Sequence, residues 1–547
     1  MKTIKIKYSL IRALALILVS LPVIIFAIGW LRWYYCLLVI VSSVAGLYWA
    51  LYGDKKAKED SSRDIEIKVS TLIIIAFIAL AWVFLSGIGG FWAQSKDYPW
   101  RNAIYRDIVL RDWPVYYPVS NGYLVYYIGY WLPPAIIGKL GLMLGASDLW
   151  AFRIGNIAQY IWASMLIVTL FLLLLALFNA NNKKKQIFLI VLFIFFSGMD
   201  ILGSIEPLGA NLYHLEWWAK YYQYSSFTTC LFWVFNQSII PWICMALLLM
   251  EENVSSYVYI GMMCLFGGPF PFVGYFIYCI TFGIIKLIQS IKAKKAISFI
   301  KSVFSISNIL SAIGIFPFLG LYLLSNDAIS GSGTLRIEQS GNALLEATEG
   351  LSGAAESTAI AGNSIKTYLM FICFEFLIVM LLIIRKNYKN PLYYVTLISL
   401  LIFPFLKMGS NVDFPMRASI PALFVVYYLV ANFLISEKGY LKKYKTPDGK
   451  EPTSKEERQK ADKYSLNRTL FLALILCLIL GAATPAVEIY RGCRQIVLHG
   501  WNNPMEDFLY TLGSDGPYSQ NGQILYLWNF GTNSPDDKAF FKYVIKK

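Results

Sequence analysis

Charged residues are scarce in this sequence, and their scarcity excludes an ordinary soluble protein. Asp, Glu, Lys and Arg make up 15% of the 547 residues, and 57% of the residues are hydrophobic. Soluble domains carry about a quarter of charged residues. In a bilayer every backbone amide must be bonded inside the protein, so repeated apolar runs of about 20 residues predict helices rather than strands. We therefore predict an all-α, multi-pass membrane protein.

Several signatures of chemistry are missing as well. No G-x-x-x-x-G-K-[ST] phosphate loop occurs, which disfavours an ATP-driven pump. The sequence has two histidines and no C-x-x-C, so we do not expect a zinc site. A disulfide framework is not expected either, because six of the eight cysteines lie inside apolar runs: Cys36, Cys244, Cys264, Cys279, Cys373 and Cys477.

The positive charge of the chain follows its predicted topology. The net charge is +15, and Lys and Arg gather in short segments between apolar runs, as the positive-inside rule requires. This distribution favours a membrane topology over a nucleic-acid partner. The first residues lack a convincing signal cleavage site, so we expect an uncleaved first helix. We expect a cytoplasmic amino terminus and an extracytoplasmic carboxyl terminus in a bacterial plasma membrane.

Apolar runs and their flanking charges predict about thirteen membrane-spanning helices, joined by external loops that hold short juxtamembrane helices. The predicted spans cover residues 9–30, 33–52, 69–90, 151–178, 187–205, 238–251, 256–269, 271–290, 303–325, 366–385, 392–408, 417–436 and 469–488. We expect one transmembrane unit over residues 1–488, with residues 489–547 as an external tail or cap.

Two predicted loops have unusual compositions. The cytoplasmic loop 437–467 is highly charged and has almost no branched aliphatic residues, so we expect a mobile tether. The external loop 326–365 is rich in Gly, Ser and Ala. A loop of this kind suits either a lid that orders over substrate or a plain flexible connection.

The external loop 91–150 contains the segment "SKDYPWRNAIYRDIVLRDWPVYY", which predicts an amphipathic helix at the membrane surface with Asp97 just before it. A structural interpretation pairs Asp97 with Arg101 and Asp107 with Arg111 across one helical turn. A functional interpretation follows because Glu206, Glu216 and Asp413 are expected at the same membrane face. Several carboxylates at one face suit a general base or an oxygen-ligated Mg²⁺ or Mn²⁺, with Asp97 and Glu216 as candidate ligands.

The segment "GYWLPPAIIGKLGLMLGASDLWAFRIGNIAQYIW" adds a Pro-Pro helix start, Lys139, and Phe152-Arg153 at the head of a span. In this order of features the chain resembles the polytopic C-type (GT-C) glycosyltransferases over roughly residues 70–180. The resemblance implies that Asp97 occupies the position of the first-loop carboxylate that deprotonates the acceptor or binds metal. It also implies a lipid-phosphate-sugar donor. We take Asp107 and Arg153 as further candidates for substrate binding.

A second external constellation lies in "YHLEWWAKYYQYSSFTTCLFWVFNQ", which contains His214, Glu216, Asn236 and Gln237 among many aromatic rings. Trp and Tyr are ordinary anchors at a membrane interface, and that interpretation accounts for about half of these rings. It does not account for the acid, the histidine and the amides. Rings that stack on sugar faces beside hydrogen-bonding side chains also suit a glycan cleft.

A third constellation, "FLKMGSNVDFPMRASIP", places Lys407 and Arg417 around Asp413. Both cations have a structural alternative, which is snorkelling to the lipid headgroups. The functional alternative is a phosphate anchor, because Arg presents a planar fork of donors and Lys a point charge.

These observations together favour an inverting membrane glycosyltransferase that moves a sugar from a polyprenyl phosphate to an extracytoplasmic lipid, glycan or protein. Its expected partners are the lipid-linked sugar and membrane lipids, and the sequence indicates neither an oligomeric state nor a certain cofactor. The alternative is a secondary transporter or a lipid or glycan flippase. For that class, Asp200 and Glu375 would be the proton sites, because both acids lie within apolar runs.

Overall fold

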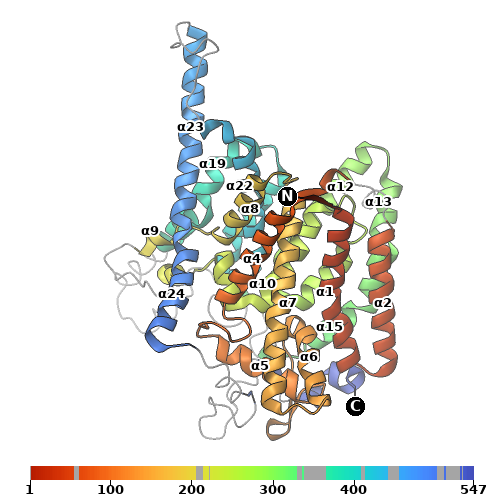
Figure 1. Cartoon of the computed structure of the whole chain (residues 1–547). Coiled ribbons are helices and arrows are strands. Elements are labelled where there is room, and N and C mark those ends of the chain that lie inside the picture. Colours follow the sequence, from red (N-terminus) through yellow and green to blue (C-terminus); the bar gives the residue numbers. More distant parts are fainter. Residues whose placement is uncertain are drawn as a thin grey trace, which may run out of the picture.

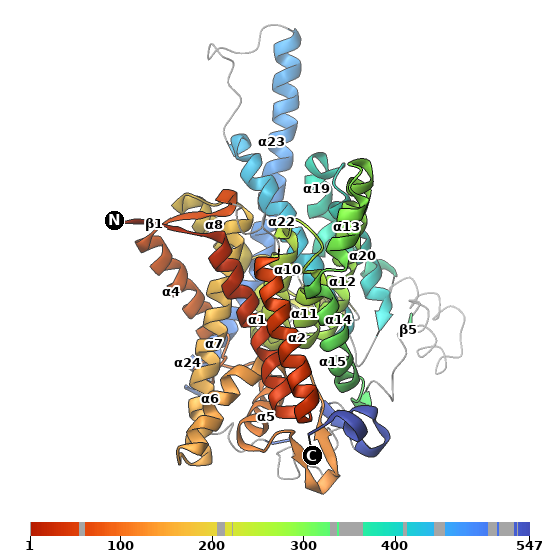
Figure 2. The ribbon, with the colours of Figure 1, turned by 90° about the vertical axis from the view of Figure 1, so that its right-hand side faces the viewer.

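Helices account for almost all of the secondary structure (Figures 1 and 2). The computed structural model describes residues 2–53, 61–204, 214–220, 222–328, 336–337, 365–407, 413–441, 455–501, 511–512, 530–532 and 534–546. The amino-terminal and carboxyl-terminal ends of the described chain lie at opposite ends of the bundle. We call the end that carries α5 (Tyr98–Leu110), α6 (Leu132–Met143) and the carboxyl terminus the outer end, after its predicted topology.

The described residues include eight helices that are long and apolar enough to cross a membrane. They are α1 (Tyr8–Trp30), α2 (Trp33–Tyr52), α7 (Asp148–Leu177), α10 (Phe227–Met250), α12 (Pro269–Lys292), the broken helix of α13 (Ala296–Val303), α14 (Ile306–Gly314) and α15 (Phe316–Leu323), the helix Ile365–Asn387 that ends in α19 (Ile378–Asn387), and the series of α23 (Lys455–Gly481) and α24 (Ala483–His499). Four shorter apolar helices join them, namely α4 (Val69–Leu85), α11 (Tyr257–Gly267), α20 (Pro391–Ile402) and α22 (Ile420–Ser436). A multi-pass helical membrane protein is thus the architecture, while the predicted number of thirteen spans is not confirmed.

Helix α10 is the centre of the bundle, because every residue in its most apolar 18-residue window is buried inside the protein. It begins at Phe227, well before the predicted start at residue 238, and the hydroxyl of Ser226 caps it by accepting from the backbone N–H of Thr229 at 2.9 Å. The prediction was wrong here because polar Asn236 and Gln237 were assigned to a loop. They lie in a helix that is buried in the protein, where Asn236 accepts a hydrogen bond from Arg101.

The predicted span 187–205 is also not one helix. Helix α8 (Lys183–Ile194) ends early, and the chain continues through a non-helical segment to the short α9 (Asp200–Ser204). The backbone N–H of Met199 donates to the carbonyl of Phe374 at 2.9 Å, so the break brings this segment against the helix Ile365–Asn387. Ser and Gly in "SGMD" weaken a helix at this point, and the partner on the other helix satisfies the freed backbone.

The charged loop 437–467 contains more regular structure than expected. Residues 455–467 form the first turns of α23, which extends beyond the other helices at the end opposite α5 (Figure 1). Good helix formers and the spacing of Glu456 and Lys460, whose Oε1 and Nζ lie 3.7 Å apart, favour this helix. The proposed lid falls mainly in residues 329–335 and 338–364, which lie outside the described residues.

Strands are short and pair antiparallel. At the amino terminus β1 (Thr3–Ile6) pairs with β2 (Ile65–Lys68), and β5 (Arg336–Ile337) pairs with β6 (Leu406–Lys407). At the outer end β3 (Tyr116–Tyr117), β4 (Gly122–Leu124) and β7 (Gly531–Thr532) form a small sheet in the order β3-β4-β7. This sheet attaches the C-terminal tail to the loop that joins α5 and α6.

Two further contacts fasten the tail to the outer end. The carboxylate of Asp107 on α5 accepts hydrogen bonds from the Thr511 hydroxyl at 2.6 Å and from the Leu512 backbone N–H at 2.9 Å. Farther along, the backbone N–H of Lys546 donates to the carbonyl of Trp30 at the end of α1, at 2.8 Å. The tail therefore contacts α5, in which polar Arg101, Asn102 and Asp107 are buried along with the apolar side chains.

We predict that Asp107→Asn destabilises the protein and loosens the tail. Asp107 is fully buried, and besides the two tail contacts it accepts from the Tyr117 hydroxyl at 2.9 Å and lies 3.3 Å from a guanidinium nitrogen of Arg106. Removal of a buried charge from such a network costs roughly 3 kcal/mol. Thermal unfolding in detergent and limited proteolysis of residues 501–547 measure the two effects.

The matched control is Asp112→Asn, which changes an exposed acid five residues farther along the same segment. Equal unfolding temperatures and equal proteolysis for the two variants would contradict the role of Asp107 as a structural anchor.

Candidate functional site

Three polar side chains, hydrogen-bonded in series, join α5 to the central helix α10 at the outer end. Asp97 stands at the start of α5, and its Oδ2 accepts a hydrogen bond from Nη2 of Arg101 at 2.8 Å. The other terminal nitrogen of Arg101 donates to Oδ1 of Asn236 on α10 at 3.0 Å. The Asp97 side chain is 45% exposed, whereas that of Arg101 is 6% exposed. The expected one-turn ion pair therefore exists, but it places a guanidinium inside the protein.

A second ion pair of the same kind comes from a different part of the chain. Helix α21 (Asp413–Ala418) places Nη1 of Arg417 3.0 Å from Oδ2 of Asp413, again one turn apart. Here too the cation is buried at 7% exposure and the carboxylate, at 38%, reaches toward solvent. Both pairs thus have a buried guanidinium and a partly exposed acid.

Two adjacent tyrosines lie within the electrostatic reach of both arginines. The rings of Tyr126 and Tyr127 have centroids 3.6 Å apart. Burial raises the pKa of both phenols, and the positive charges of Arg101 and Arg417 oppose that rise. The tyrosines therefore stay protonated and can donate hydrogen bonds. We call the whole group the outer polar site: Asp97, Arg101, Tyr126, Tyr127, Asn236, Asp413 and Arg417.

Three buried donors of the outer polar site have no acceptor within the described part of the chain. They are Nε of Arg101, Nε of Arg417 and Nδ2 of Asn236. Buried donors are normally hydrogen-bonded, so donors without acceptors at a half-open position indicate a missing acceptor. Two guanidinium groups and an amide suit an anion with several oxygens, and a phosphate has that chemistry.

A second polar group, which we call the acidic cluster, lies among α9, α10 and α24. Its members are Asp200, Glu216, Glu375 and Glu488 with His214 and Arg491. Glu488 connects three side chains. Its Oε1 lies 3.1 Å from Nδ1 of His214. Its Oε2 accepts hydrogen bonds from Nε1 of Trp233 at 2.8 Å and from Nη2 of Arg491 at 2.5 Å. The His214 ring also stacks on Trp233 with centroids 4.9 Å apart.

Glu216 is fully enclosed by hydrogen-bond donors. It accepts from the Ser225 hydroxyl at 2.7 Å, from the Gln223 amide at 3.0 Å and from the Ser226 backbone N–H at 2.9 Å. Burial, opposed by the charge of His214, raises the pKa of Glu216 to about 7. For His214 burial alone would lower the pKa, but the hydrogen bond to Glu488 and the charge of Glu216 outweigh it and raise the pKa above its ordinary value.

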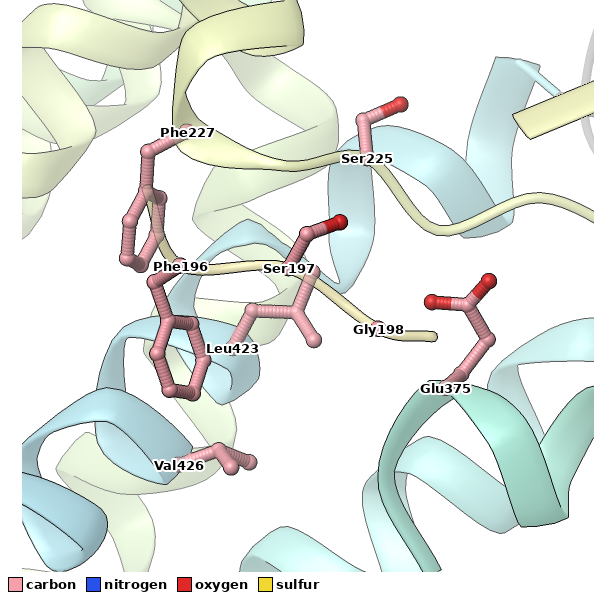
Figure 3. Close-up of a pocket in the computed structure, with 8 residues that line it drawn as sticks. All are labelled: Phe196, Ser197, Gly198, Ser225, Phe227, Glu375, Leu423 and Val426. Carbon is pink, nitrogen blue, oxygen red and sulfur yellow. The ribbon is translucent and has the colours of Figure 1, made fainter. Parts of the chain in front are cut away.

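The carboxyl groups of Asp200 and Glu375 lie close enough for a hydrogen bond. Asp200 also accepts from the Thr484 hydroxyl at 2.8 Å and from Nε1 of Trp218 at 3.2 Å. Figure 3 shows the carboxyl group of Glu375 beside Gly198, where a Cβ atom would collide with it. The pocket at this point is lined by Phe196, Ser197, Gly198, Ser225, Phe227, Glu375, Leu423 and Val426.

The structure thus divides the predicted site residues between several places. Asp97, Asn236, Asp413 and Arg417 come together in the outer polar site, while His214 and Glu216 belong to the acidic cluster. Of the other predicted residues, Asp107 anchors the tail, and Arg153 stacks over Phe91 with its Cζ 4.5 Å from the ring centroid. Gln237 is fully buried. The side chain of Lys407 lies outside the described part of the chain. The predicted constellations therefore do not form one shared cleft.

A Mg²⁺ or Mn²⁺ site on Asp97 and Glu216 does not fit this arrangement. Asp97 pairs with Arg101, and Glu216 lies among serine hydroxyls and amides of the other group. Within the described residues no set of three or more His, Cys, Asp or Glu side chains is placed to hold a metal ion. We therefore derive no chemical step through a metal.

Sequence reasoning missed the roles of Arg101, Tyr126, Tyr127, Glu488 and Arg491. The spacing of Glu488 and Arg491 within the last apolar helix was a signal, because acid and base three residues apart share one helix face. Their partners His214 and Trp233 are far away in the sequence, so spacing alone does not identify them. Comparisons of the chain with protein-family models, with curated proteins and with solved structures gave no match.

We predict that rising pH destabilises the protein through the acidic cluster. Because the pKa of Glu216 is raised from about 4.5 to about 7, the folded protein binds more protons than the unfolded chain between these values. This contribution to stability is present at low pH and is lost as the pH rises toward and past 7. The raised pKa of His214 acts in the same direction.

Thermal unfolding from pH 5 to pH 8 should therefore show a decline, and Glu216→Gln should reduce its slope. The expected difference is on the order of 3 kcal/mol. Glu252→Gln, at an exposed site, is the matched control and should leave the slope unchanged. A flat wild-type profile would contradict the prediction.

Proposed function

We propose that the protein is a membrane glycosyltransferase that uses a polyprenyl-phosphate sugar as donor at the outer face of a bacterial plasma membrane. The observation that carries the proposal is the outer polar site, in which two buried arginines and Asn236 have donors without acceptors beside a half-exposed carboxylate. Such a site combines an anion receptor with a base. Transfer of a sugar away from a lipid phosphate needs both.

The arginines bind and stabilise the leaving phosphate in this proposal. When the bond between the anomeric carbon and the phosphate oxygen breaks, the electron pair stays on that oxygen and its negative charge grows. Preorganised cationic donors in a water-poor site stabilise the developing charge. Asp97 and Asp413 neutralise the arginines in the free protein, and their exposure allows them to turn outward when phosphate takes their place. Lys407 remains a predicted further contact.

Asp97 is the proposed base. Its carboxylate takes the proton of the acceptor hydroxyl while the acceptor oxygen forms its bond to the anomeric carbon from the side opposite the phosphate. Attack from the opposite side in a single displacement inverts the configuration at that carbon. The carboxylate lies at the start of α5, and its 45% exposure gives an acceptor from outside access to it.

The order of elements agrees with the expectation from the sequence. After α4 the chain forms α5, then α6 with Pro133 and Pro134 in its first turn, then α7 with Phe152 and Arg153 near its start. Two short helices between two apolar helices are what the resemblance to the GT-C glycosyltransferases leads us to expect.

We predict that Asp97→Asn reduces kcat for transfer from labelled polyprenyl-phosphate sugar by about 10²- to 10⁴-fold, the usual contribution of a positioned base. Binding of polyprenyl phosphate should persist, because the arginines remain. By contrast, Arg417→Gln should weaken that binding, since it removes a guanidinium from the anion receptor.

Asp148→Asn is the control, because Asp148 is an exposed acid in the first turn of α7 at the same end of the protein. It should transfer sugar at the wild-type rate. Full activity of Asp97→Asn would remove this residue from the mechanism, and unchanged binding by Arg417→Gln would remove the phosphate receptor.

A secondary transporter or flippase is the second candidate, and the Asp200–Glu375 pair is the observation that favours it. Two carboxyl groups that lie together inside the bundle, beside a pocket, are groups that can load and release protons in a transport cycle. We expect Glu375→Gln to separate the candidates. A glycosyltransferase should keep its transfer activity in this variant, because the contacts of Glu375 are with the acidic cluster. A proton-coupled transporter reconstituted in liposomes should lose its ion-driven uptake.

A further inference from the structure

The C-terminal tail brings an aromatic ring directly to the outer polar site. Phe530 stacks with Trp100 at a centroid distance of 5.8 Å and an angle of 25°, and it meets Tyr126 edge-on at 5.0 Å. Tyr126 in turn contacts Tyr127, with the two rings tilted by 33°. We call these four residues the aromatic platform: Trp100, Tyr126, Tyr127 and Phe530. All four are half-buried, so each keeps part of its surface accessible.

Backbone contacts fix the position of Phe530. Its carbonyl accepts from the backbone N–H of Val125 at 2.9 Å, and the next two residues form β7 against β4. The Thr532 hydroxyl then donates to Asp327 at 3.0 Å, and Nζ of Lys538 lies 3.2 Å from the same carboxylate. The ring therefore reaches Trp100 and Tyr126 from a rigid segment.

The platform adjoins the residues that we assign to the reaction. Trp100 immediately precedes Arg101, the partner of Asp97. Tyr126 and Tyr127 lie within reach of the charges of both Arg101 and Arg417. A group that rests on these rings is thus near the charges of Arg101 and Arg417, the proposed phosphate receptor.

The aromatic platform is not needed to attach the tail to the bundle. The tail is already held by Asp107 and by the backbone of Trp30, two contacts that do not involve Phe530. A platform of four partly accessible rings beside donors that hold an anion suits the face of a sugar ring, whose C–H groups pack on aromatic faces while its hydroxyls reach polar neighbours.

We propose that the C-terminal tail completes a sugar-binding subsite, in which Phe530, Trp100, Tyr126 and Tyr127 hold the pyranose or furanose ring of the glycosyl unit. This inference rests on the proposed function, because it identifies what the outer polar site binds beside the phosphate. Phe530 is then a residue that determines specificity and comes from the tail and not from the bundle.

Saturation-transfer NMR on the full-length protein in nanodiscs tests the subsite directly. The probes are methyl hexosides and methyl pentosides, and transfer from the protein to sugar C–H protons reports stacking. We expect a signal for at least one probe, with binding about three- to tenfold weaker in Phe530→Leu, as loss of an aromatic partner implies. Phe530→Trp should retain binding.

Phe541→Leu is the matched control. Phe541 belongs to the same tail and its ring contacts Tyr123 at 4.7 Å, outside the platform, so this variant should bind sugars like the wild type. If no probe gives a signal with the wild-type protein, or if Phe530→Leu binds as the wild type does, the subsite is overturned.

A parallel assay with polyprenyl-phosphate sugar separates this inference from the proposed function. An increased KM for the lipid-linked sugar in Phe530→Leu places the donor sugar on the platform, and an increased KM for the acceptor alone places the acceptor sugar there. If glycosides bind through Phe530 but the protein transfers no sugar, the subsite stands and the enzymatic proposal fails. If transfer occurs with unchanged KM values in Phe530→Leu, the enzyme stands and the subsite fails.

Discussion

A guanidinium that is buried among membrane helices needs a carboxylate close by, and the outer end of this protein is built around two such pairs. Arg101 and Arg417 are both almost fully buried, and an unpaired charge in such a place costs several kcal/mol. Asp97 and Asp413 neutralise them across single helical turns. Each pair lies within one short helical segment, and the guanidinium of Arg101 also joins α5 to α10 through Asn236.

Helix α10 connects these pairs to the acidic cluster. Its first turn supplies the Ser226 cap beside Glu216, Trp233 reaches Glu488, and Asn236 reaches Arg101. Between the last two lies Val234, whose φ of −132° and ψ of 35° interrupt the helix. A break at this point lets the two segments of α10 point their polar side chains in different directions. One central helix therefore presents side chains to two separate polar regions.

Sequence reasoning predicted the class of protein and the local pairs, since hydropathy and helical spacing are local properties. The Asp97–Arg101 pair follows from one helical turn, and Asp413 and Arg417 are paired across one turn in the same way. The start of α10 was missed because Asn236 and Gln237 resemble loop residues until their surroundings are known. Trp233 and Glu488 are 255 residues apart, so only the folded chain reveals that they meet.

The tail has a consequence for how the protein is made. The described tail residues, 511–512, 530–532 and 534–546, follow the bundle helices α1 to α24 in the chain, and they contact α5, β4 and the end of α1. During synthesis the ribosome releases these residues after the helices have entered the membrane. A newly inserted bundle therefore lacks the contacts of the tail with α5, β4 and α1. These contacts form only when the tail packs onto helices that were synthesised hundreds of residues earlier.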